Sequence, residues 1–222
     1  MKQLDAGLRI VLFALLTGAT ATAFPQPPPE RALSRGEALR ALASPEATAR
    51  AEAVVWIANR GAMDDASLLH ERLRDESGLV RSYAEQGLWL LWTRSGDAGI
   101  DRQMARAGEQ MQAGQLAEAT SLLTEIIHKR PGFAEAWNRR ATVHYLAGEY
   151  RKSIADCDQV LKRNPKHFGA LSGLGQIHTK LEQYEEALKW FQRALEVNPN
   201  MTGVEINIHQ VEELLKKKRI AT

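Results

Sequence analysis

The chain has 222 residues, 44% of them apolar and 25% charged, which is the composition of a globular protein with enough apolar side chains for a sizeable core. Its formal net charge of +2 is too close to zero to favour nucleic acid or an anionic membrane surface as a partner. The single cysteine, Cys157, excludes an intramolecular disulfide, and its place within an apolar pattern predicts a core residue rather than a reactive thiol.

The N-terminal stretch, residues 1–23, has the features of a secretory signal peptide. Lys2 and Arg9 flank a short N-terminal region, an apolar run follows from Ile10 to Leu16, and Ala21 and Ala23 provide the small residues of a cleavage site. The alternative is a retained N-terminal anchor, but the apolar run is well short of the roughly 20 residues that span a bilayer. We therefore expect export to the periplasm or secretion, with no membrane insertion after cleavage.

Residues 24–32 form a proline-rich stretch that we expect to be an extended tether. From Leu33 onward the apolar residues follow the three-and-four spacing of amphipathic helices. This spacing predicts an all-α protein.

An internal repeat with a 31-residue offset occurs within residues 33–97. The sequences ATARAEAVVWIANRG and GLVRSYAEQGLWLLW align with Arg50 over Arg81, and a leucine-bearing helix lies between them. An acidic turn, then Val80 and Arg81, then an alanine-containing helix resembles the HEAT repeat family. A plain three-helix bundle is the alternative for this segment.

A second repeat, with a 34-residue period, covers residues 98–202. Pro131, Pro165 and Pro199 each close a pair of amphipathic helices, in units of residues 100–133, 134–167 and 168–201. The third unit resembles the tetratricopeptide repeat family through Leu174, Gly175, Tyr184, Ala187, Phe191, Ala194 and Pro199. The second unit keeps fewer of these features and the first is the most divergent. Small residues such as Gly175 are expected where two helices cross closely.

Residues 203–222 predict a C-terminal capping helix. Its apolar stripe consists of Val204, Ile208, Val211 and Leu215 on an otherwise charged helix, which suits the end of a solenoid. The basic cluster at residues 216–219 is interpreted as a solvated helix end rather than a binding patch. Together the resemblances imply a right-handed helical-repeat solenoid of HEAT-like helices, three tetratricopeptide units and this cap.

The sequence carries no motif for catalysis, a cofactor or a metal. It has no glycine-rich phosphate loop, no His-Glu-x-x-His helix, no Gly-x-Ser-x-Gly elbow and no paired cysteines. His144 and His178 occupy the same position in successive units, which favours a shared packing role over metal ligation. We therefore predict a protein that is not an enzyme and that uses no cofactor.

The tetratricopeptide resemblance implies protein binding, because the inner helices of that family line a concave channel for an extended peptide or a partner helix. By that resemblance the predicted partner-binding residues are Met104, Met111, Asn138, Arg139, Thr142, Tyr145, Gln176, Thr179 and Lys180. Some family members grip the C-terminal carboxylate of a chaperone with Lys, Asn and Arg. Here Met104, Gly108, Gly169 and Gly173 stand at those places, so this clamp is not expected.

The predicted function is an exported, non-catalytic adaptor or scaffold that binds a protein or peptide partner in this channel. The alternative is a chaperone-like holder, or an accessory subunit of an envelope enzyme or assembly complex. The sequence does not identify the partner or the oligomeric state. It also leaves open whether the main binding surface is the channel or the HEAT-like segment around Trp89 and Trp92.

We expect the mature chain to begin at or near Phe24, because Ala21 and Ala23 satisfy the small-residue requirement of signal cleavage. N-terminal sequencing of the protein recovered outside the cytoplasm would measure this. An intact Met1 on that form would contradict cleavage.

Overall fold

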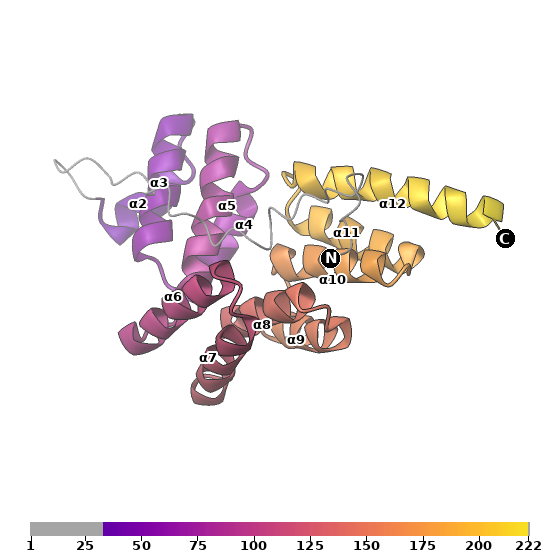
Figure 1. The fold of residues 1–222 in the computed structure, drawn as a ribbon. Coiled ribbons are helices and arrows are strands. Elements are labelled where there is room, and N and C mark those ends of the chain that lie inside the picture. Colours follow the sequence, from indigo (N-terminus) through magenta and orange to yellow (C-terminus); the bar gives the residue numbers. More distant parts are fainter. Residues whose placement is uncertain (1–32, 222) are drawn as a thin grey trace.

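The computed structural model of the protein describes residues 33–221, which form helices joined by short turns and contain no strand (Figure 1). The all-α prediction is confirmed, whereas the predicted signal peptide and tether lie outside the described residues. No helix among residues 33–221 is long and apolar enough to cross a membrane. The helices are α2 (Arg35–Ala41), α3 (Ala47–Arg60), η1 (Met63–Asp65), α4 (Ala66–Arg72), α5 (Gly78–Thr93), α6 (Ala98–Gln112), α7 (Leu116–Lys129), α8 (Ala134–Leu146), α9 (Tyr150–Arg163), α10 (Phe168–Lys180), α11 (Tyr184–Val197) and α12 (Thr202–Ala221).

Two arginines that the sequence repeat aligns, Arg50 and Arg81, make the same contacts in the N-terminal segment, residues 33–97. Each donates from Nη1 to the main-chain carbonyls six and five residues before it, at 2.9 Å in both bonds of Arg50 and at 2.8 and 3.0 Å for Arg81. Each also reaches a side chain on a later turn: Nε of Arg50 donates to Asp75 at 2.9 Å, and Nε of Arg81 donates to Asn200 at 2.9 Å. The repeat of the sequence is therefore also a repeat of structure.

The turn after α11 occupies the place of a further repeat on the N-terminal segment. Nη1 of Arg72 donates to the carbonyl of Leu42 at 2.8 Å. One 31-residue repeat later, the carbonyl of Leu73 accepts the equivalent bond from Nδ2 of Asn200, also at 2.8 Å. One apolar core runs across this junction and includes side chains of α3, α5, α10, α11 and α12. The N-terminal segment is therefore packed on the third unit, residues 168–201, which is far from it in the sequence; Figure 1 shows the ends of α11 and α12 that face α4 and α5.

Aromatic side chains form the centre of this junction. Trp92 of α5 stacks on His167 with ring centroids 4.3 Å apart, and Trp89 meets Phe168 edge to face at 5.2 Å. A Cβ atom at Gly169 would lie 2.4 Å from Cη2 of Trp89, so only glycine fits there without displacing the indole. The tryptophans of α5 serve packing, as expected for such bulky residues.

The later units repeat a histidine contact in register. Nδ1 of His144 lies 2.6 Å from Oε2 of Glu149, and Nδ1 of His178 lies 2.6 Å from Oε1 of Gln183, five residues on in each unit. Both histidines thus bond the turn between the two helices of a unit, which confirms a shared structural role. Cys157 is buried in the core of α8 to α10, and burial raises the pKa of its thiol.

Replacing Gly175 with Leu should destabilise the third unit. A Cβ atom at Gly175 would lie 2.5 Å from ring atoms of the fully buried Phe191 on α11, so the two helices would be forced apart. Overpacking of this kind lowers the free energy of unfolding by about 1–3 kcal/mol or more. Urea unfolding would measure it, with Gly132→Leu as the control, since no atom lies within 4 Å of a Cβ at Gly132. Equal midpoints for the two variants would show that the helix crossing is elsewhere.

Candidate partner-binding site

The predicted partner-binding residues lie on the first helix of each 34-residue unit. Met104 and Met111 are on α6, the residues from Asn138 to Tyr145 are on α8, and those from Gln176 to Lys180 are on α10. We call the surface formed by these three helices and by the following α12 the inner face. Whether these residues touch a partner stays a prediction, and their surroundings differ along the face.

The α6 end of the inner face is part of an apolar core. Met104 is 4% exposed and packs with Ile100, Ala107 and Leu123, while Met111 is half-buried against the same cluster. This cluster is separate from the one that contains Tyr145. The structure therefore uses Met104 for packing of the first unit, in a cluster that also includes Ala136 and Val143 of α8.

Arg139, one of the predicted partner-binding residues, is paired with a carboxylate of its own helix. Its Nε donates to Oε1 of Glu135 at 3.2 Å, and Oε2 of Glu135 lies 3.3 Å from Nε2 of His167. Burial alone would raise the pKa of Glu135, but the hydrogen bond from His167 and the charge of Arg139 outweigh it, so the pKa is lowered. The charge of Arg139 is thus paired with that of Glu135 through one hydrogen bond from Nε, and its side chain is 21% exposed.

Asn138 and Thr142 are also engaged within α8. Nδ2 of Asn138 donates to Oε2 of Glu135 at 3.2 Å, and Oγ1 of Thr142 donates to the carbonyl of Asn138 at 3.1 Å. Both side chains are buried. Both predicted residues are therefore already bonded within their own helix. A partner would have to share or replace those bonds.

Four other polar atoms of the inner face are buried and find no hydrogen-bond partner within residues 33–221. They are Oη of Tyr145, Oγ of Ser172, Oε1 of Gln176 and Oδ1 of Asn207. Their residues are between 1% and 6% exposed. Burial, with a smaller effect of the neighbouring Tyr150, raises the pKa of Tyr145 to about 12, so its hydroxyl stays protonated at neutral pH. Such atoms are uncommon in native proteins, which makes them the informative feature of this face.

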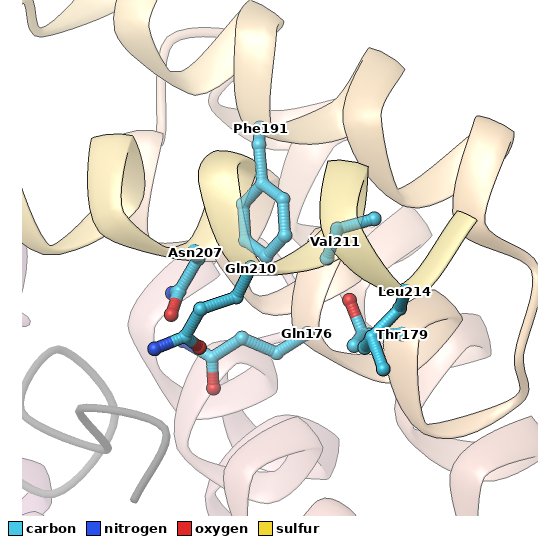
Figure 2. A pocket seen from close by; sticks show the side chains of 7 residues that line it. All are labelled: Gln176, Thr179, Phe191, Asn207, Gln210, Val211 and Leu214. Carbon is cyan, nitrogen blue, oxygen red and sulfur yellow. The ribbon is translucent and has the colours of Figure 1, made fainter. Parts of the chain in front are cut away.

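A pocket opens between α10 and α12 at the end of the inner face (Figure 2). It is lined by Gln176, Thr179, Phe191, Asn207, Gln210, Val211 and Leu214. Of the predicted residues, Gln176 is buried here, Thr179 is half-buried with Oγ1 on the carbonyl of Gly175 at 2.8 Å, and Lys180 is exposed beside the pocket. The sequence analysis did not predict the lining residues of α12, because it interpreted this helix only as a cap. The position of Gln210, one 34-residue period after Gln176, could have indicated that α12 continues the inner face.

The inner face offers neutral hydrogen-bonding groups and apolar side chains. Among residues 33–221 no group of three or more His, Cys, Asp or Glu side chains is placed to hold a metal ion. The arrangement is suited to binding through amides, hydroxyls and apolar contacts.

The family model for the tetratricopeptide repeat matches residues 134–167 and 169–201. The second and third units are therefore tetratricopeptide repeats, as the sequence predicted. The helix pair of residues 100–133 and the HEAT-like segment are not matched, and the HEAT resemblance stays a prediction.

Known proteins that resemble the chain contain the same repeat. The chain is 35% identical over 130 residues to a TPR repeat-containing protein of Rhizobium etli, covering 59% of this chain and 64% of that protein, less than two thirds of its length. The TPR domain of Sgt2 from Aspergillus fumigatus superimposes with a TM-score of 0.53 at 17% identity, over 55% of this chain and 83% of that one. The first TPR of Spaghetti, solved with an HSP90 peptide, superimposes with a TM-score of 0.51 at 20% identity, over 53% and 93% of the chains. These likenesses establish a shared fold.

Replacing Tyr145 with Phe should stabilise the protein in the absence of a partner. The hydroxyl of Tyr145 is buried without a hydrogen bond, and leaving such a group buried costs about 1 kcal/mol or more. The free energy of unfolding, measured by urea titration, should therefore rise by about 1 kcal/mol. The half-buried Tyr150, whose ring lies 5.8 Å from that of Tyr145, provides the control, because Tyr150→Phe should leave stability almost unchanged. Destabilisation by Tyr145→Phe would show that the hydroxyl is bonded.

Proposed function

We propose that the protein is an exported, non-catalytic adaptor or scaffold that binds a segment of a partner protein on its inner face. The observation that carries this proposal is the set of buried, unpartnered polar atoms on α8, α10 and α12, within a chain whose residues 134–201 match tetratricopeptide repeats almost throughout. Atoms of this kind gain hydrogen bonds when a polypeptide covers them, so binding relieves a cost that the free protein bears.

A peptide partner is supported by the similar structures. The Spaghetti domain was solved with an HSP90 peptide of sequence SRMEEVD, and a TPR domain of yeast Sti1 is described as a complex with pHsp70. The partner of this chain should differ from a peptide held by its terminal carboxylate. Gly169 stands where that clamp needs a long cationic side chain, and Trp89 occupies the space beside it.

Export is supported by the sequence of residues 1–23, with their apolar run and the small residues at Ala21 and Ala23. The adaptor would then act in the periplasm or outside the cell. A partner that meets it there is itself an envelope or secreted protein.

Crosslinking in intact cells of the source organism, followed by mass spectrometry of the captured proteins, tests this function. Wild-type protein should capture a defined partner, and Thr179→Arg should reduce capture about tenfold or more, because the new side chain obstructs the inner face. Thr120→Arg on α7 is the matched control, since both threonines are half-buried and both donate to the carbonyl four residues earlier at 2.8 Å.

The pattern of capture separates the possible roles. A partner retained in fixed stoichiometry favours the scaffold, whereas clients released with time favour a chaperone-like holder. If wild-type protein captures nothing beyond what Thr179→Arg captures, the inner face does not bind a partner and the proposed function is wrong.

A further inference from the structure

Two histidines lie at the same tryptophan in the junction that joins the N-terminal segment, residues 33–97, to the third unit. Trp92 of α5 stacks on His167 with ring centroids 4.3 Å apart, and its ring lies 5.9 Å from that of His70 on α4. Nε2 of His167 lies 3.3 Å from Oε2 of Glu135, so a carboxylate would compensate a proton on that ring.

His70 has no such compensation. It is 9% exposed, and its Nδ1 finds no hydrogen-bond partner within residues 33–221. Among these residues the charges that act on its ring come from Lys166, His167 and Arg74, and no carboxylate is among them. Burial first, and then these positive charges, lower the pKa of His70 from its usual 6.5 to about 4. His70 is therefore neutral in the folded protein at neutral pH.

The helix that carries His70 depends on the junction for its packing. α4 has seven residues and is too short to be stable by itself in water. Its buried residues are Leu69 and His70, and Leu69 belongs to the core that also contains Phe168 of the third unit. Two residues after α4, Arg74 donates to the carbonyl of Glu196 at the end of α11. α4 thus forms part of the N-terminal side of the junction.

A proton on His70 favours an open junction. In the closed junction an imidazolium is buried among positive charges, whereas in an open junction water solvates it. Because the pKa of His70 is about 4 when buried and 6.5 when exposed, the open form binds the proton more tightly. The closed form therefore keeps its stability above pH 6.5 and loses it as the pH falls from 6.5 towards 4. Between pH 7.5 and 5.0 the equilibrium constant for opening rises about 30-fold through His70.

One carboxyl group of the junction acts in the opposite direction. Glu85 of α5 lies beside Asn198, and burial raises the pKa of its carboxyl group. Protonation of Glu85 as the pH falls therefore favours the closed form. The two effects are separable, because replacing His70 removes only one of them.

We propose that His70 makes the junction acid-sensitive: when its ring takes up a proton, α4 loses its packing and the N-terminal segment separates from the third unit. Opening uncovers Phe168 and Gly169 at the start of α10, against which Trp89 lies in the closed form. This inference concerns the fold and is independent of the proposed function.

Hydrogen–deuterium exchange of the purified protein at pH 7.5 and 5.0 tests the inference, with each rate divided by the rate of an unstructured amide at the same pH. The amides of α4 should exchange faster at pH 5.0. Their increase should be about 30-fold larger in wild type than in His70→Leu, whose side chain is neutral and of similar size. This comparison cancels the effect of Glu85. α7, which packs on α6 and α8, should keep its rates.

Two further variants keep the test decisive. His128→Leu, at an exposed position on α7, is the matched control and should show the same effect of pH as wild type. His70→Gln, also neutral, takes the place of His70→Leu if that variant does not fold.

Three outcomes would overturn the inference. The first is exchange of α4 that does not respond to pH in wild type, and the second is an equal response in the His70 variants. The third is an equal loss of protection in α4 and α7, because acid would then unfold the whole chain instead of opening one junction. The proposed function is tested separately by crosslinking and stands or falls without this result.

Discussion

The stacking of His167 on Trp92 is the contact on which the arrangement of the chain depends. The imidazole is fully buried, 4.3 Å from the indole. Its Nδ1 accepts the N–H of Ala170 at 3.1 Å, so Nε2 carries the hydrogen and faces Glu135 at 3.3 Å. One side chain therefore joins α5, the start of α10 and α8. Because a buried polar ring needs partners for both nitrogens, these three helices hold a fixed relation to one another.

This junction adds a contact between units that are far apart in the sequence. In a simple solenoid each unit contacts only its neighbours in sequence. Here the N-terminal segment contacts the third unit, and Asn200 receives from Arg81 the bond that Asp75 receives from Arg50. The segment that precedes the repeats thereby covers the beginning of α10, where Trp89 lies against Gly169.

Charged and neutral side chains of the inner face differ in whether they have partners within the fold. Glu135 and Arg139 form an ion pair within α8. The neutral atoms of Ser172, Gln176 and Asn207 remain unpartnered within the described residues 33–221. Among these residues the charged groups are paired within the fold and the neutral groups are unpartnered.

The sequence by itself determined the repeating elements of this protein. The even spacing of Pro131, Pro165 and Pro199 and the small residue at Gly175 predicted paired helices that cross closely, because helix formation and close crossing leave a local, periodic record in residue type. The equivalence of Arg50 and Arg81 was visible for the same reason. Only the tertiary structure decided that Arg81 bonds Asn200, that Oε2 of Glu135 faces Nε2 of His167, that Met104 belongs to a core and that Asn207 faces Gln176. Those contacts depend on how whole helices stack across as many as 119 residues of chain, and a periodic pattern carries no information about which stacked surfaces meet.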